Sequence, residues 1–422
     1  MRTRHWVLGV MAVVVITGVA RPGRGPAAKR GQAPAGVRPA IDVLLTDSFR
    51  LIRGRRVGLL SNRAGVDQAG VRSVDRLLAQ GVHLAALFSP EHGFSGTAAP
   101  GAAVGSTTDS ATGLPIYSLY GKSAAPSDAI LDSLDVMLID LQDVGARYYT
   151  YLWTVTEVMR AAARHSVPVV VLDRPNPIGG AVQGDVLLPA YRSPVGLLAI
   201  PARHGMTLGE LARLAAHDLG IAGRLIVVPM AGWSRRMYWD ETGLPFVPPS
   251  PNLPRFEAEL HYPGLCLFEG TTLSVGRGTD HPFEQVGAPW VDTTALLRVL
   301  RRASPPGVAF AGVAFTPRRP GDGKYADTLV YGVRLAVLDR RRYDPVRTAM
   351  FLLNAVARQA GPLKHAVFPS PPRQFERLLG RPLESLRPWL RPHPDWARLA
   401  LVWQAEQSRF LARRRPFLLY PE

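Results

Sequence analysis

The chain has 422 residues, of which 47% are hydrophobic and 20% charged, a composition typical of a folded protein rather than a disordered one. Its formal net charge is +17, but seven of these charges lie in residues 1–38, where no acidic residue occurs, which leaves +10 for the remainder. This remaining excess is scattered arginine without a lysine-rich block. It disfavours a nucleic-acid-binding protein and suits an anionic substrate or an anionic cell surface.

The N-terminus has the pattern of a secretory leader. Two arginines precede a 15-residue apolar run, Trp6–Ala20, which is shorter than the roughly 20 residues that a membrane-spanning helix needs. We therefore expect a signal peptide over residues 1–20, a flexible lead-in over residues 21–38, and a periplasmic or extracellular location. An uncleaved N-terminal membrane anchor is the alternative. The single cysteine, Cys266, excludes an intramolecular disulfide.

Residues 39–232 alternate short apolar runs with segments of helical periodicity. Thr207 and Glu210 form a capping-box pattern at the start of one such helix. Apolar runs of this kind, separated by helices, predict a parallel sheet covered on both faces, and thus a Rossmann-like α/β domain. The expected strands are residues 56–60, 84–88, 115–119, 136–139, 168–172 and 225–229.

The rest of the chain divides into two parts. Residues 233–290 are rich in aromatic residues, proline and glycine and lack helical periodicity, and a loop this long is usually functional or disordered. Because the aromatic content argues against disorder, we expect this segment to form a cleft. Residues 291–422 predict a smaller α+β domain. Its expected elements are strands over 308–315 and 328–338 and helices over 293–301, after the Asp344-Pro345 cap, and over about 396–413.

Polar side chains follow four of the predicted strands. The carboxyl ends of parallel strands meet at one edge of a sheet, where ligands bind in open α/β folds. Carboxylates, an amide and arginines gathered there suit general acid–base chemistry on a polar substrate. Structural caps and turns are the alternative, and for Asp173 in the turn sequence Asp-Arg-Pro-Asn-Pro we favour the cap. The residues are Asn62, then Glu91 and His92, then Asp140, Gln142, Asp143 and Arg147, and finally Asp173, Arg174 and Asn176.

The residue types also indicate a class of substrate. Aromatic side chains such as Tyr148 and Trp290 suit stacking on sugar rings, and Arg147 and Arg277 suit the bidentate binding of an anionic group. Two carboxylates that flank a glycosidic bond are the usual arrangement in glycosidases. The chemistry therefore points to a carboxylate-based hydrolase acting on a sugar-like substrate.

Several cofactor-dependent and nucleophilic mechanisms lack their sequence signals. No Gly-x-Gly-x-x-Gly follows the first strand, no Walker sequence occurs, and no Gly-x-Ser-x-Gly elbow supports a serine nucleophile. No pair of histidines has metal-ligand spacing. We expect a site without a cofactor or a metal.

Six ordered motifs between Ile41 and the C-terminus carry a family resemblance. They resemble the NamZ family of bacterial exo-β-N-acetylmuramidases, formerly catalogued as a domain of unknown function. The resemblance implies a glycoside hydrolase that removes terminal N-acetylmuramic acid (MurNAc) from the non-reducing end of peptidoglycan fragments. It also implies a Rossmann-like domain used without a nucleotide, a smaller C-terminal domain and a cleft between them. The motifs are Ser61-Asn62 with Gly65, Ser89–Gly93, Asp140–Tyr151, Asp173–Pro177, His204–Thr207, and Phe268–Thr271 continuing to Trp290.

The resemblance implies roles for named residues. Glu91 matches the family's leading catalytic candidate and is expected to act as general acid, with His92 setting its orientation or its pKa. Asp143 is the expected second carboxylate. The expected partners are muropeptides or disaccharides derived from peptidoglycan, with Arg147 and Arg277 on the lactyl carboxylate. The substrate-binding residues that we expect are Asn62, Gln142, Arg147, Tyr148, Asn176, Glu269 and Arg277.

Two positions depart from the family pattern. Gln183-Gly184 stands where relatives commonly carry Glu-Gly, and Arg63-Ala64-Gly65 stands where they often have Gln-Thr-Gly. If the missing glutamate is catalytic in relatives, its role falls here to Asp143 or Glu269, or activity is reduced. A catalytically silent peptidoglycan-binding protein on the same fold is therefore the main alternative. A metal-dependent deacetylase or amidase is the third.

Overall fold

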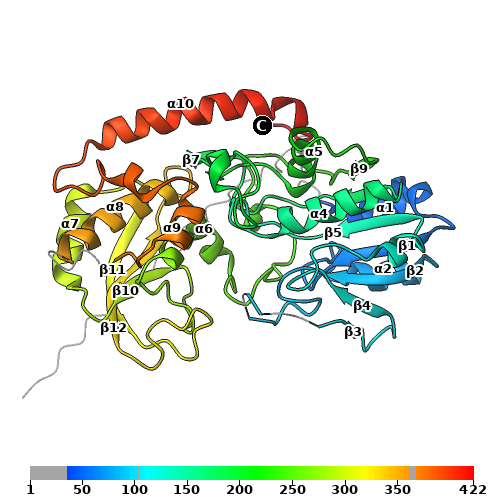
Figure 1. Ribbon diagram of the computed structural model, residues 1–422, viewed down its shortest axis with the longest axis horizontal. Helices are drawn as coiled ribbons and strands as arrows, with labels where there is room; N and C mark the ends of the chain where they lie inside the picture. The colour runs from blue at the N-terminus through cyan, green and yellow to red at the C-terminus, as the bar shows by residue number, and fades with distance from the viewer. Residues whose placement is uncertain (1–35, 100, 103–104, 361–366) are drawn as a thin grey trace, which may run out of the picture. The chain divides into compact units, whose positions relative to one another are not determined.

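The computed structural model describes residues 36–99, 101–102, 105–360 and 367–422 (Figure 1). The expected signal peptide and residues 21–35 of the expected lead-in lie outside these ranges. Within them, none of the helices combines the length and the apolar content needed to cross a bilayer.

A seven-stranded sheet organises the first part of the described chain, with the strand order β3-β4-β2-β1-β5-β6-β9. Every neighbouring pair is parallel except the edge pair β3–β4. The parallel sheet predicted from the apolar runs is thus confirmed. Its strands are β1 (Arg56–Ser61), β2 (His83–Ser89), β3 (Thr107–Thr108), β4 (Pro115–Ser118), β5 (Val136–Asp140), β6 (Val169–Leu172) and β9 (Leu225–Val228).

Both faces of this sheet are covered, as near-continuous apolar strands require. On β5, Met137 and Ile139 belong to one hydrophobic cluster, whereas Val136 and Leu138 belong to another on the opposite face. Helices α4 and α5 cover the first face, and α1 and α2 cover the second. The predicted capping box of Thr207 and Glu210 is present at the start of α5. The helices are α1 (Ala40–Asp47), α2 (Ser73–Ala79), α3 (Asp128–Leu131), α4 (Tyr151–Arg164) and α5 (Leu208–Asp218).

A second, antiparallel sheet has the order β10-β12-β11 and packs against α7, which in turn packs against α8. Its strand β10 lies before residue 291, so this sheet begins inside the segment expected to form the cleft. One cluster of buried side chains extends from Met137 on β5 to Val333 on β12 and joins the two sheets. The elements are β10 (Gln285–Ala288), α7 (Thr293–Ala303), β11 (Val308–Phe315), β12 (Val330–Val337) and α8 (Pro345–Gln359).

The segment 233–290 contains a helix that its sequence pattern did not predict. Helix α6 (Phe256–Leu265) is buried at every residue from Ala258 to Leu265. A helix enclosed on all sides has no polar face, so it shows no amphipathic periodicity. The expectation of a helix-free segment was wrong for this reason.

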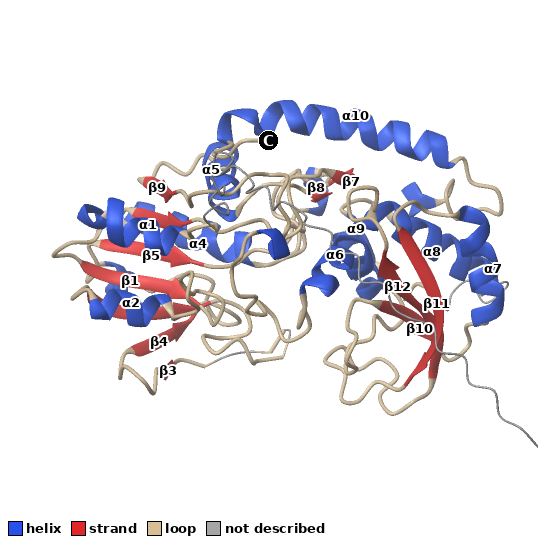
Figure 2. Ribbon diagram, turned by 180° about the vertical axis from the view of Figure 1, so that it is seen from behind, coloured by secondary structure: helices blue, strands red, loops and turns tan. Residues whose placement is uncertain are grey.

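The C-terminal residues return to the first part of the chain. Helix α10 (Trp396–Arg414) lies along the short antiparallel pair β7 (Gln183–Val186) and β8 (Pro201–Arg203), as Figure 2 shows. Gln407 donates to the Gly184 carbonyl at 2.9 Å, and the Tyr420 hydroxyl donates to Asp173 at 2.6 Å. The end of the chain therefore completes the parallel-sheet part. Helix α9 (Arg373–Leu379) precedes α10.

Candidate active site

Glu91 is held where β2 ends, two residues beyond Ser89. One carboxylate oxygen, Oε1, accepts from the N–H of Gly101 at 2.9 Å, and Oε2 accepts from the hydroxyl of Thr150 at 2.7 Å. The side chain is 9% exposed. Burial, together with the neighbouring Glu91 carboxylate, raises the pKa of Tyr120 to about 12, which keeps that hydroxyl protonated beside Glu91. The structure thus fixes the carboxylate from two segments and leaves it at a cavity wall.

His92 lies in a sharp turn with a left-handed backbone, φ +72°, followed by Gly93 at φ +74°. Its Nδ1 lies 2.9 Å from the carbonyl of Ala98. Because a carbonyl can only accept, Nδ1 carries the proton in this contact and Nε2 is left as an acceptor. Burial lowers the pKa of His92 and the charge of Arg277 lowers it further, although Glu91 opposes the shift. The imidazole is therefore neutral at pH 7.

A cavity of about 140 Å³ opens at Glu91. Five of the residues predicted from the sequence share its walls, namely Glu91, His92, Tyr148, Glu269 and Arg277. They come from segments almost 190 residues apart in sequence. The structure thus brings these five side chains to the walls of one cavity.

Glu269 and Arg277 form an ion pair within this cavity. Arg277 is 7% exposed and lies over the Phe283 ring at 5.0 Å from its centroid. Its Nη1 is buried and has no hydrogen-bond partner among the described residues. A buried guanidinium nitrogen without a partner is costly, so this cavity can satisfy it by binding an anionic group. Lys324 Nζ donates to the carbonyls of Phe268, Glu269 and Leu273 and so fixes the loop that carries Glu269.

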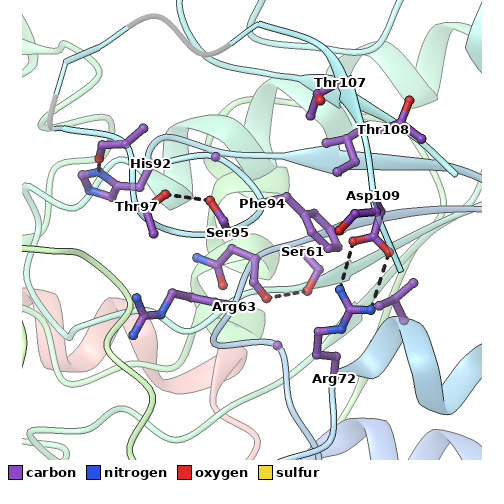
Figure 3. A pocket seen from close by; sticks show the side chains of 17 residues that line it. Ser61, Arg63, Arg72, His92, Phe94, Ser95, Thr97, Thr107, Thr108 and Asp109 are labelled. Carbon is purple, nitrogen blue, oxygen red and sulfur yellow. Dashed lines mark hydrogen bonds and ion pairs between the residues drawn. The ribbon is translucent and has the colours of Figure 1, made fainter. Parts of the chain in front are cut away.

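A second pocket, of about 520 Å³, adjoins the first, and His92 lines both (Figure 3). Asn62 lies in its wall, where Nδ2 donates to the Tyr151 hydroxyl at 2.6 Å and Oδ1 accepts from the N–H of Ala64 at 3.0 Å. The amide of Asn62 is therefore engaged within the protein, and its position shapes the pocket.

Asp143 and Gln142 do not line the Glu91 cavity. Asp143 Oδ2 accepts from the N–H of Gly145 at 2.8 Å and lies 3.5 Å from Nε2 of His204. The amide of Gln142 donates to the carbonyls of Asp143 and Pro175. The loop after β5 folds back on itself, which turns both side chains inward, and Glu269 instead of Asp143 is the second carboxylate of the cavity.

Arg147 and Asn176 also differ from their expected positions. The guanidinium of Arg147 donates to four backbone carbonyls, and the Asn176 amide donates to Met206 and accepts from Ile178. Of the donors and acceptors on these two side chains only the buried Nε of Arg147 has no partner among the described residues, and neither side chain lines the Glu91 cavity. The carbonyls that accept from Arg147 belong to Asp185, Ile200, Leu378 and Leu379.

Gln183, the departure from the family pattern, lies outside the Glu91 cavity. Its Oε1 accepts from Arg203 at 2.8 Å and its Nε2 donates to the Tyr343 carbonyl at 3.2 Å. The glutamine therefore joins two segments and removes no carboxylate from the cavity.

Other residues of the site were missed. Thr150 and Tyr120 contact Glu91, and Gln374 on α9 lines the cavity. Thr150 follows the Tyr148-Tyr149 pair directly, which was an available signal, whereas nothing in the sequence connects Gln374 to Glu91. Glu259 on α6 is fully buried with both carboxylate oxygens unpartnered, and its burial and then the charge of Asp143 raise its pKa well above the usual value. Within the described ranges, no group of three or more His, Cys, Asp or Glu side chains is placed to hold a metal ion.

Comparison with known proteins gives concordant matches along the chain. The family models for the N-terminal and C-terminal parts of the exo-β-N-acetylmuramidase NamZ match residues 57–257 and 260–420. The peptidoglycan β-N-acetylmuramidase NamZ of Bacillus subtilis (strain 168) is 45% identical over 322 residues, which cover 76% of this chain and 77% of that protein. Two crystal structures of DUF1343 family proteins from Bacteroides fragilis NCTC 9343 are each 31% identical. One has a TM-score of 0.82 and covers 91% of this chain and 99% of its own, and the other has a TM-score of 0.74, with 92% and 100% covered.

Proposed function

Because the chain belongs to the NamZ family, we propose that it is an exo-β-N-acetylmuramidase, which removes MurNAc from the non-reducing end of peptidoglycan fragments. The single observation that carries this proposal is the cavity in which Glu91, His92, Glu269 and Arg277 meet. It provides two carboxylates and an arginine with an unpartnered nitrogen. This is the set that hydrolysis of an acidic sugar requires.

We assign the proton transfer to Glu91. Its carboxylate is held by Thr150 and Gly101 at the cavity wall, from which it can protonate the leaving oxygen of a glycosidic bond. Neutral His92 beside it fixes the turn that carries Glu91. Glu269 forms an ion pair with Arg277, and a carboxylate at this place opposes the positive charge that develops on the sugar ring in the transition state.

Arg277 supplies the selectivity for MurNAc. The lactyl group of MurNAc is a carboxylate, and the related sugar GlcNAc lacks it. The unpartnered Nη1 of Arg277 can donate to that carboxylate in a charge-assisted hydrogen bond. Since Arg147 is engaged by four carbonyls, we assign the lactyl group to Arg277 alone.

The test is the release of free MurNAc from the disaccharide MurNAc-GlcNAc or from a synthetic β-MurNAc glycoside. We expect release from both and none from the matching β-GlcNAc glycoside. Binding of the disaccharide without release would favour the silent binding protein instead. Loss of activity to a chelator would favour the metal-dependent deacetylase or amidase.

We also propose that the protein acts in the cell envelope, in the periplasm or outside the cell. The support is the charged and apolar pattern of residues 2–20. Sequencing the N-terminus of the protein from fractionated cells tests the proposal. A mature chain that begins near Arg21 in the envelope or medium is expected, an intact chain in the membrane fraction would indicate an anchor, and an intact chain in the cytosol would contradict it.

A further inference from the structure

The pocket of about 520 Å³ beside the Glu91 cavity has the chemistry of a sugar-binding site. Its size lies within the range usual for small-molecule sites, roughly 300–1,000 Å³. The ring of Phe94 supplies an apolar surface. Hydroxyl groups, which both donate and accept hydrogen bonds, match the hydroxyl groups of a sugar. Six line the pocket, from Ser61, Ser95, Thr97, Thr107, Thr108 and Ser110.

One positive charge in this pocket is not compensated. Arg72 forms ion pairs with Asp109 at 3.0 Å and with Asp75 at 2.7 Å, so the Arg72–Asp109 pair adds no net charge. Arg63 lines the same pocket, is half-buried, and has no ion-pair or hydrogen-bond partner among the described residues. The pocket therefore offers one guanidinium to an anionic group.

A close backbone contact holds the stem of Arg63. The stem of Arg63 packs on Gly96, which has φ +68°, and any side chain at position 96 would collide with it. In Figure 3 the Arg63 guanidinium lies on the side of the pocket near His92, away from the Arg72–Asp109 pair. His92 also lines the Glu91 cavity, so the two spaces adjoin at this residue.

The proposed substrate has the matching pattern of charge. In a glycan of alternating MurNAc and GlcNAc, only every second sugar carries a lactyl carboxylate. When the terminal MurNAc occupies the Glu91 cavity, the next sugar is neutral and the third is acidic. We propose that the pocket lined by Arg63 and Phe94 is a second sugar site, which takes the two sugars after the terminal MurNAc and in which Arg63 binds the lactyl carboxylate of the internal MurNAc. The proposal rests on the proposed function and adds to it a preference for longer glycans.

The experiment compares two tetrasaccharides that differ only at the third sugar, MurNAc-GlcNAc-MurNAc-GlcNAc and MurNAc-GlcNAc-GlcNAc-GlcNAc. For the wild-type full-length protein, we expect kcat/KM for MurNAc release to be about tenfold higher on the first, the size expected from one charge-assisted hydrogen bond. Arg63→Gln should bring this ratio close to one, mainly through KM. Arg63→Lys should retain part of the preference, because it keeps the charge without the planar fork. Arg50→Gln removes an arginine that is exposed and lines none of these pockets, and it should leave the ratio unchanged.

A wild-type ratio near one, or a ratio that Arg63→Gln does not change, would overturn the second sugar site while leaving the proposed function intact. Absence of MurNAc release from the plain disaccharide would instead overturn the proposed function, and the inference with it. Thermal unfolding of each variant verifies that the protein compared is folded.

Discussion

The ends of strands β2 and β6 carry similar residues, but the carboxylate after β2 borders a cavity and the carboxylate after β6 is buried in a structural cap. Each apolar strand is followed by an acidic residue and a proline, with a basic residue or histidine beside the acid. At the end of β6, Asp173 accepts from four donors and is fully buried. At the end of β2, Glu91 accepts from Gly101 and Thr150, lies beside the Tyr120 hydroxyl and borders a cavity. The comparison indicates that a strand-end carboxylate is structural where donors enclose it completely, and is available for chemistry where it also borders a cavity.

Four hydrogen-bond donors from three parts of the chain surround the Asp173 carboxylate. They are the hydroxyl of Thr207 at 2.6 Å, the N–H groups of Arg174 and Gly209, and the hydroxyl of Tyr420 at 2.6 Å. Next to it, the buried Arg174 forms an ion pair with Asp140, at the end of β5. The Asp-Arg-Pro-Asn-Pro turn is thus a structural cap, as its turn chemistry predicted.

Removing the carboxylate of Glu91, at the end of β2, should greatly reduce activity and leave the fold intact. Glu91→Gln keeps the shape of the side chain but cannot transfer the proton. We expect MurNAc release to fall by about 10²- to 10⁴-fold, with an unchanged melting temperature. Glu257→Gln, an exposed change on α6, is the matched control and should retain full activity. Turnover of Glu91→Gln close to that of wild type would remove Glu91 from the mechanism.

Removing the carboxylate of Asp173, at the end of β6, should instead destabilise the fold and leave the activity of the folded protein nearly unchanged. Asp173→Ala leaves buried donors on Thr207, Gly209 and Tyr420 without their acceptor, which costs about 3 kcal/mol or more of unfolding free energy. Urea unfolding measures this loss, and kcat per folded molecule should stay near the wild-type value. A stable Asp173→Ala protein without activity would show that this end takes part in the reaction.

A third acid, Glu259, accepts no hydrogen bond from any described residue, and the pH dependence of stability can test this difference from Glu91 and Asp173. Its pKa is raised in the folded protein, first by burial and then by Asp143, so the folded state holds a proton that the unfolded state releases above about pH 4.5. The contribution of Glu259 to stability is therefore complete below that pH and falls by about 1.4 kcal/mol per pH unit as the pH rises toward the folded-state pKa.

Glu259→Gln should remove the share of this slope that Glu259 contributes, because the amide does not ionise, whereas Asp173, whose pKa burial raises to about 7, contributes to the slope in every variant. Unfolding free energies at a series of pH values from 4 to 8 measure it, and the exposed Glu257→Gln variant should keep the wild-type slope. Equal slopes in all three proteins would mean that Glu259 is ionised in the folded state.

The smallest effect is expected at Gln183. Its amide accepts from Arg203 and donates to Tyr343, outside the Glu91 cavity. Gln183→Glu loses the donor, and we expect about 1 kcal/mol of destabilisation and less than a twofold change in kcat. A large gain in MurNAc release would show instead that the glutamate common in relatives is catalytic.

The elements with local signals were predictable from the sequence. The apolar runs placed the strands of the parallel sheet, and the caps at Thr207 and Asp344 placed the starts of α5 and α8. Helix α6 was not predictable from the sequence, because a helix buried on every side has no periodic pattern.

The site was predictable only in part. The motifs named Glu91, His92, Glu269 and Arg277, which share one cavity. They also named Arg147, whose partners at residues 378 and 379 lie more than 200 residues away in the sequence. A sequence shows which side chains carry donors, but it does not show which distant carbonyls will use them.

The contact between Tyr420 and Asp173 bears on how the protein folds. The cap at the end of β6 lacks one of its four donors until Tyr420 packs against it, and the N–H of Arg235 likewise donates to the carbonyl of Pro421. Every strand precedes these two residues in the sequence. The parallel sheet thus reaches its final set of hydrogen bonds only when the segment after α10 has folded back onto it.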